Sequence, residues 1–163
     1  MARIAPVTTP QELDLARELW REWAQLIDDP AWSRVFEADL ADLAKIYGPP
    51  GGVFMLAWEG KDLAGGGALR RIDDELCEMQ RVYVRPKLRG RGLARSLSVA
   101  LMGEARRMGY GAVRFAIPAD FVAKLAGGIK LYESLGFRRI PTYAGNLPDA
   151  VCMEARVRSA ARR

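Results

Sequence analysis

The chain has 163 residues, of which 50% are hydrophobic and 28% are charged, and its formal net charge is +5. This length suits one domain with its own core, and no apolar run is long enough to cross a bilayer. Because the chain has no histidine, Ser-His-Asp and Cys-His catalysis are excluded and no metal site is expected. The first residues show no signal-peptide pattern, so a cytoplasmic protein is expected, with Cys77 and Cys152 as buried, reduced thiols.

The N-terminal third predicts a strand and two helices. The strand covers residues 4–7. Residues 9–12, Thr-Pro-Gln-Glu, form a capping box with proline at the first helical position, so a helix should begin there and end near residues 28–30. A second helix has apolar residues on one face and stops at the Gly/Pro run 48–52. Those apolar residues are Phe36, Leu40, Leu43 and Tyr47.

Three strands should follow, separated by short turns. The turns lie at residues 60–62 and at Asp73-Asp74. Glycines 65–67 are poor strand formers, and they indicate a bulge or a close backbone approach. The predicted strands cover residues 53–59, 63–70 and 76–84.

Helices and strands alternate in the rest of the chain. Glycines at 109 and 136 should end the two helices. The elements are a helix from Gly92 to about Met108, a strand over 112–117, a helix from about 122 to 135 and a strand over 150–157. The predicted class is therefore α/β, with a mixed, twisted sheet flanked by helices. Residues 1–157 are expected to form one domain, and 158–163 a basic tail.

The segment between Val82 and Ala94 carries the most specific signal. A strand stops at Pro86, and a basic, glycine-containing turn leads into a helix. Glycines let the backbone approach a ligand, and the first N–H groups of a helix lack internal partners at the positive end of its dipole. A phosphate or pyrophosphate is the expected guest. The six basic residues between 81 and 95 favour the same ligand, although a solvated face explains some of them.

Comparison with known phosphate-binding motifs indicates which class of phosphate ligand the loop binds. A P-loop is absent, because the only Gly-Lys is followed by Asp62, and a dinucleotide fingerprint would place Arg95 where a small residue is needed. The run that fits is Arg-Gly-Arg-Gly-Leu-Ala over residues 89–94, after Val-x-Pro. Here the sequence resembles the GNAT superfamily of acyl-CoA-dependent N-acyltransferases. A second element of that family, Leu-Tyr-x-x-x-Gly-Phe, matches residues 131–137. The resemblance is to a small, bacterial-type, single-domain member, and it is firmest from about residue 53 to 154.

The resemblance implies a cofactor and a reaction. Acetyl-CoA would donate an acetyl group to a primary amine, which attacks directly in a ternary complex without a covalent intermediate. The backbone of Val82, Tyr83 and Val84 would bind the pantetheine arm, and one N–H there would polarise the thioester carbonyl. The pyrophosphate would lie on the backbone of Arg89, Gly90, Arg91, Gly92, Leu93 and Ala94.

Tyr132 and Glu78 are the candidate catalytic residues. A phenol with a pKa of about 10 can protonate a leaving thiolate, so Tyr132 is expected to be the general acid and to lie at the cofactor; packing on Phe137 is the alternative. Glu78 is the expected general base, directly or through water. Strand alternation places it on one face with Gln80, Val82 and Val84. Two alternatives remain open: Glu78 could be a surface residue paired with an arginine, or a chain of waters could act as the base.

The sequence signals for the acceptor-binding residues are less specific than those for the cofactor. In the family the first two helices cover the acceptor, which makes Trp23, Trp32 and Phe36 candidates, with core packing as the alternative. Residues 141–146 resemble a segment of a bacterial subgroup, so Tyr143 and Asn146 could reach the same pocket; a plain turn is the alternative. A small-molecule amine, an amino acid, an antibiotic, a polyamine or a peptide or protein amine all remain open as the acceptor.

The chain also departs from the family pattern, and other functions compete. Leu125 and Gly128 replace the usual asparagine and alanine before Tyr132. A non-catalytic acyl-CoA-binding or sensor module is the main alternative, although retention of Tyr132 favours an enzyme. Arg-Gly-Arg-Gly and a pI of about 9.5 suggest nucleic-acid binding, but no aromatic series is interleaved with the basic run. We therefore expect neither a nucleic-acid nor a membrane partner, and a homodimer is open.

Overall fold

The computed structural model describes residues 2–27, 30–125, 127–143 and 149–158, and within them one seven-stranded sheet has the order β1-β2-β3-β4-β5-β7-β6. The strands are β1 (Ala2–Pro6), β2 (Val53–Glu59), β3 (Asp62–Arg71), β4 (Leu76–Val84), β5 (Ala112–Ile117), β6 (Arg138–Ile140) and β7 (Val151–Arg156). The helices are α1 (Pro10–Ile27), α2 (Pro30–Ala41), α3 (Leu43–Tyr47), α4 (Leu93–Arg107) and α5 (Gly128–Ser134). The predicted α/β class with a mixed sheet is confirmed.

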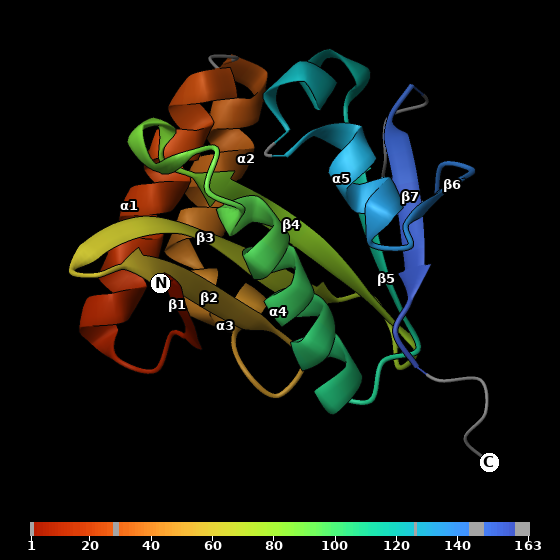
Figure 1. Ribbon diagram of the computed structural model, residues 1–163, viewed down its shortest axis with the longest axis horizontal. Helices are drawn as coiled ribbons and strands as arrows, with labels where there is room; N and C mark the ends of the chain where they lie inside the picture. The colour runs from red at the N-terminus through yellow and green to blue at the C-terminus, as the bar shows by residue number, and fades with distance from the viewer. Residues whose placement is uncertain (1, 28–29, 126, 144–148, 159–163) are drawn as a thin grey trace.

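Helices cover both faces of the sheet. In Figure 1, α4 and α5 lie in front of it and α1, α2 and α3 lie behind. Each layer has its own cluster of buried apolar side chains: Leu97, Leu101 and Phe137 belong to the α4 side, and Trp20 and Leu43 belong to the α1 side. Burying a leucine completely stabilises a fold by roughly 1.5–3 kcal/mol, so both layers are anchored mainly by apolar area. None of the described helices is long and apolar enough to span a membrane.

The helical N-terminal region largely follows its sequence signals. The capping box is present: the Glu12 N–H donates to Thr9 Oγ1, and the Thr9 N–H donates to the Glu12 carboxylate, both at 3.1 Å. The predicted second helix is two helices, because the chain leaves helical conformation at Asp42 (φ −111°, ψ 23°). Leu40 and Leu43 stay buried in one cluster, so the interruption preserves the apolar face.

The glycines of β3 are both closely packed and irregular, as predicted. A Cβ at Gly65 would lie 2.2 Å from the Tyr83 carbonyl oxygen. The register between β3 and β4 shifts between Gly66 and Ala68. Side chains larger than hydrogen at Gly65 would therefore push β4 away.

The C-terminal half contains two differences from the predictions. The helix expected from residue 122 is wrong at its start: residues 119–124 form a 3-10 turn, and α5 begins at Gly128. Positive φ angles at Gly127 and Gly128 (81° and 71°) interrupt the helical path. Strand β6 was missed because three residues carry too short a pattern to read. Cys77 and Cys152 are buried free thiols, and burial raises the pKa of Cys77 to about 12.

Candidate active site

The centre of the site is a fork between β4 and β5. These strands pair in parallel only from Leu76 opposite Ala112 to Glu78 opposite Arg114. Beyond that point β4 continues to Val84 and β5 to Ile117, and Figure 1 shows the two strands separating from their meeting point at the lower right. The facing backbone edges therefore lack a strand partner within the described residues, and could hydrogen-bond an extended ligand.

A glycine-containing loop follows the outer end of this fork. After a 3-10 turn over residues 86–88, Gly90 and Gly92 have φ angles of 79° and 78°, and α4 begins at Leu93. A Cβ at either glycine would meet no atom within 4 Å, so the left-handed backbone, rather than crowding, is what requires glycine. The loop thus offers open space at both glycines just before the N-terminus of α4, which suits the predicted anion.

The basic residues around this loop divide into two groups. Arg85 is held on the α1 side, where its guanidinium donates to Glu22 at 2.6 Å and to Glu18 at 2.9 Å. Arg89 remains exposed beside the loop, and its Nε donates to the Val84 carbonyl at 2.9 Å. The cations left exposed near the loop are Lys87, Arg89, Arg91 and Arg95. Part of the basic run is therefore a structural anchor, which neither the anion site nor the solvated face of the sequence analysis predicted.

Strand β4 contains a bulge that changes which face its side chains occupy. Arg81 has a φ of 60°, opposite the register shift in β3. Gln80 faces the α1 side, where it accepts a hydrogen bond from Tyr47 of α3 at 2.5 Å. Val82 and Val84 instead belong to the α4-side core. The prediction that these valines share a face with Glu78 is therefore wrong, because the bulge breaks the alternation.

The Arg81 side chain is enclosed by aromatic rings. Its guanidinium carbon lies 4.5 Å from the ring centroids of Trp20 and Trp23 and 4.9 Å from that of Phe36. It also pairs with Asp39 at 3.1 Å, and only 14% of the side chain is exposed. Two of the predicted acceptor residues thus contact Arg81, and their role toward an acceptor stays a prediction. The side chain of Trp32 lies outside the described part of the structure.

Glu78 is a buried carboxylate with three donors. It accepts hydrogen bonds from Arg70 at 3.2 Å, from Tyr143 at 2.5 Å and from the Gln80 amide. Only 5% of Glu78 is exposed, so the alternative of an ordinary surface pair does not describe it. Tyr143 is therefore brought to the candidate base, whereas Asn146 lies outside the described residues.

Tyr132 lies on the other face of the sheet. It is 1% exposed, and its ring is 5.0 Å from that of Phe115, the first residue of β5 beyond the paired segment. Burial raises the pKa of Tyr132 to about 12, opposed by a hydrogen bond with Ser98. The phenol therefore keeps its proton at neutral pH and can act as a donor. Ser98 was not anticipated as part of the site, since a serine inside an amphipathic helix gives no signal.

The fork thus places two kinds of group on its two sides. Glu78 ends the paired segment on the α1 side, and Tyr132 packs just past it on the α4 side. A protonated phenol and a carboxylate in these positions could serve as an acid and a base for a ligand threaded between the strands.

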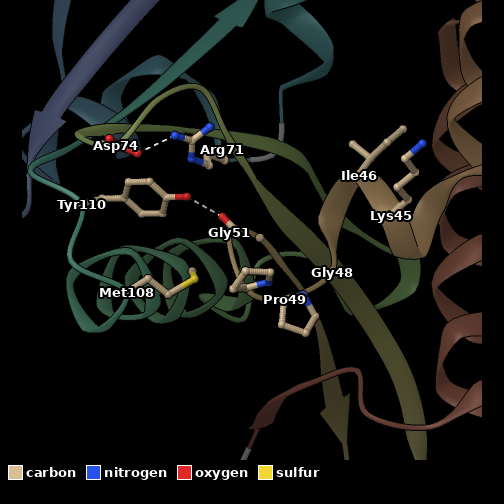
Figure 2. A pocket seen from close by; sticks show the side chains of 11 residues that line it. Lys45, Ile46, Gly48, Pro49, Gly51, Arg71, Asp74, Met108 and Tyr110 are labelled. Carbon is tan, nitrogen blue, oxygen red and sulfur yellow. Dashed lines mark hydrogen bonds and ion pairs between the residues drawn. The ribbon is translucent and has the colours of Figure 1, made fainter.

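A separate pocket lies at the opposite end of the sheet from the glycine loop. It has a volume of about 420 Å³ and is lined mainly by the 45–52 segment and the β3–β4 turn. Figure 2 shows its interactions: Tyr110 donates to the Gly51 carbonyl at 2.6 Å, and Arg71 pairs with Asp74 at 2.5 Å. None of the candidate catalytic residues lines it.

Comparison with known proteins gives one consistent result. The sequence profile of the acetyltransferase (GNAT) family matches residues 13–137. The chain is 32% identical over 143 residues to the uncharacterized N-acetyltransferase YjgM of Escherichia coli. The aligned region covers 86% of this chain and 82% of that protein. Among solved structures, the putative acyl-CoA N-acyltransferase from Klebsiella pneumoniae is 25% identical, with a TM-score of 0.71 and coverage of 96% and 98%. The PaiA N-acetyltransferase from Thermoplasma acidophilum, solved in complex with coenzyme A, has a TM-score of 0.68 at 15% identity, with coverage of 96% and 99%.

Proposed function

The chain belongs to the acetyltransferase (GNAT) family, as an acyl-CoA-dependent N-acyltransferase, and we propose that it transfers an acetyl group to a primary amine by direct attack in a ternary complex. The observation that carries this proposal is the fork between β4 and β5, with the glycine loop at its outer end and Tyr132 and Glu78 on its two faces.

The acyl donor of the family is acetyl-CoA, and the residues present suit it. The backbone of residues 89–94 is proposed to bind the pyrophosphate, because both glycines are left-handed and the space above them is open. The unpaired edge of β4 over Val82, Tyr83 and Val84 is proposed to bind the pantetheine arm and to donate one N–H to the thioester carbonyl.

The proposed proton transfers use the two faces of the fork. An alkylammonium with a pKa of about 10 has no lone pair, so it must lose a proton before attack. Glu78 accepts that proton, directly or through water. The amine nitrogen then bonds to the carbonyl carbon, the carbon–sulfur bond breaks, and Tyr132 gives its proton to the leaving thiolate. The nitrogen loses its second proton through water to the Tyr132 phenolate, and Glu78 releases the first proton to solvent.

Calorimetric titration of acetyl-CoA and CoA into the protein tests the cofactor loop. We expect micromolar binding that Gly92→Glu abolishes, because a side chain at φ 78° strains the loop and a carboxylate repels the pyrophosphate. Gly109→Glu is the matched control: Gly109 lies beyond the other end of α4, also has a positive φ (93°), and also faces open space.

Product formation tests the reaction itself. We expect thiol release from acetyl-CoA that depends on added amine, with the N-acetylated amine detected by mass spectrometry. Binding without release for a broad amine panel would favour the sensor module. Equal loss of binding in Gly92→Glu and Gly109→Glu would contradict the assignment of the loop.

A further inference from the structure

A row of alternating charges crosses the sheet on the face opposite α4. One member lies on each of five successive strands, and neighbouring members are register partners. In order across the sheet they are Arg70 on β3, Glu78 on β4, Arg114 on β5, Glu154 on β7 and Arg138 on β6. We refer to these five residues as the charge row.

The first four members of the charge row are held in place by direct contacts. Arg70 donates to Glu78 at 3.2 Å, and Arg114 Nε donates to Glu154 at 2.6 Å. Tyr143 contacts both Glu78 and Arg114. Its hydroxyl donates to Glu78 at 2.5 Å, and its ring centroid lies 5.1 Å from the Arg114 guanidinium carbon. The groups are therefore oriented before any ligand arrives.

The centre of the row coincides with the fork. Glu78 and Arg114 are the last paired residues of β4 and β5, so they border the point where the strands separate. Arg114 is a quarter exposed, and Arg70, on the other side of Glu78, is about half exposed. An amine that reaches the proposed thioester from the α1 side would meet an anion and a cation on adjacent strands.

We propose that the acceptor is an α-amino acid, bound as a zwitterion with its ammonium at Glu78 and its carboxylate at Arg114; this rests on the proposed function. Neighbouring strands are about 4.8 Å apart, a spacing that opposite charges on one carbon can bridge. A simple amine would leave Arg114 paired only with Glu154. A polyamine would bring a second cation against an arginine on either side of Glu78, which costs energy at this range.

The same arrangement accounts for turnover. The ammonium gives one proton to Glu78, the nitrogen bonds to the acetyl carbonyl carbon, and the thiolate leaves with the proton of Tyr132. The second nitrogen proton passes through water to the Tyr132 phenolate, and Glu78 releases the first to solvent. The product nitrogen is then a neutral amide, which no longer attracts Glu78. Loss of that attraction favours release of the N-acetyl amino acid.

The experiment compares matched acceptor pairs by the rate of thiol release. Each α-amino acid is measured against the amine that lacks only its carboxylate, such as alanine with ethylamine and phenylalanine with phenethylamine. We expect at least about tenfold higher kcat/KM for an amino acid than for its partner amine, the size expected for a charge-assisted hydrogen bond.

Substitutions in the charge row test whether Arg114 causes the preference for an amino acid over its partner amine. Arg114→Gln should lower kcat/KM for the amino acid by roughly tenfold or more, mainly through KM, and should leave the partner amine within about threefold. Arg114→Lys should recover part of the loss. Arg138→Gln is the matched control, because it removes the same charge from the same row two strands away from Arg114, and it should change neither rate.

The outcomes separate this proposal from the one it rests on. Equal use of amino acids and partner amines, or an equal loss for both in Arg114→Gln, overturns the amino-acid proposal and leaves amine acetylation standing. Failure of every amine to release thiol overturns the proposed function, and the amino-acid proposal with it. Unchanged acetyl-CoA affinity and melting temperature in Arg114→Gln show that the variant is folded.

Discussion

Tyr132 packs on Phe137, with ring centroids 5.9 Å apart, and is also the proposed proton donor to the leaving thiolate. The raised pKa, about 12, keeps the phenol protonated at working pH. We expect Tyr132→Phe to lower kcat by roughly 100- to 10,000-fold, because the leaving thiolate loses its proton donor, while the affinity for CoA changes by about twofold or less. Steady-state kinetics and calorimetry measure the two quantities.

Tyr110→Phe is the control for Tyr132→Phe. Tyr110 also donates a hydrogen bond, to the Gly51 carbonyl, but at the other end of the sheet. Its loss should affect stability without lowering kcat. Full turnover in Tyr132→Phe would show that another group protonates the thiolate.

Glu78 offers a second test at the residue scale. Glu78→Gln keeps the size of the side chain and removes the proton acceptor, so we expect kcat/KM near neutral pH to fall by roughly 100-fold. The remaining rate should rise about tenfold per pH unit below the amine pKa, because the unprotonated fraction of the amine rises by that factor. A pH–rate profile checks this.

The control for Glu78→Gln is Glu75→Gln. Glu75 is more than half exposed and pairs with Arg158 at 3.1 Å, away from the fork. A profile of unchanged height and shape in Glu78→Gln would assign the proton transfer to water.

At the scale of elements, the bulge in β4 contains Arg81. Its guanidinium joins β4 to rings on α1 and α2, and its backbone has a φ that only glycine adopts easily. We expect Arg81→Ala to lower the free energy of unfolding by about 2–4 kcal/mol, since the cation–ring contacts vanish and Asp39 loses its partner. Urea denaturation measures the loss.

Arg81→Gly separates the side-chain contacts from the backbone strain. Glycine in a strand is usually less stable than alanine by about 0.5–1 kcal/mol. At a φ of 60° the order should reverse, because alanine keeps a strain of about 1–3 kcal/mol that glycine relieves. If the alanine variant is the more stable one, the bulge relaxes once the arginine is removed.

At the scale of the whole molecule, both layers have an apolar core, but the charge row lies only on the face opposite α4. The α4 side is an apolar core that buries Tyr132 and Cys77. The opposite side carries the charge row and the polar group around Glu78. The fork is where the two layers meet, so a ligand between the strands would contact both.

Two weak acids, Cys77 and Tyr132, are buried in the core on the α4 side, and their burial predicts that the fold loses stability at alkaline pH. Burial raises the pKa of Cys77 from 9.0, and that of Tyr132 from 10.0, each to about 12. The unfolded chain therefore loses these protons first. The stability they contribute is complete below about pH 9 and is lost as the pH rises toward about 12, by on the order of 1–3 kcal/mol per group.

Urea denaturation at about pH 8 and about pH 11 measures this loss. The variant with Cys77→Ala and Tyr132→Phe together lacks both groups, so its free energy of unfolding should change less between the two pH values. An equal change in the variant and the parent protein would assign alkaline unfolding to other groups.

Local patterns in the sequence determined much of the architecture. The bounds of β2, β4 and β5 agree with the predictions, because apolar alternation and flanking turn residues act within a few positions. The capping box at residues 9–12 and a helix beginning near Gly92 were predicted for the same reason. The family motif at residues 89–94 also lies in one continuous segment, so it was recognised without the fold.

The tertiary structure alone decided how the site is arranged. The bulge at Arg81, the end of pairing at Glu78 and Arg114, and the contact of Tyr143 with Glu78 all join residues far apart in the chain. Strand alternation assumes a regular ladder, so it placed Val82 on the wrong face. The sequence thus determined the elements and the loop through short-range preferences, whereas the faces of the fork and the charge row depend on sheet register, which only long-range packing sets.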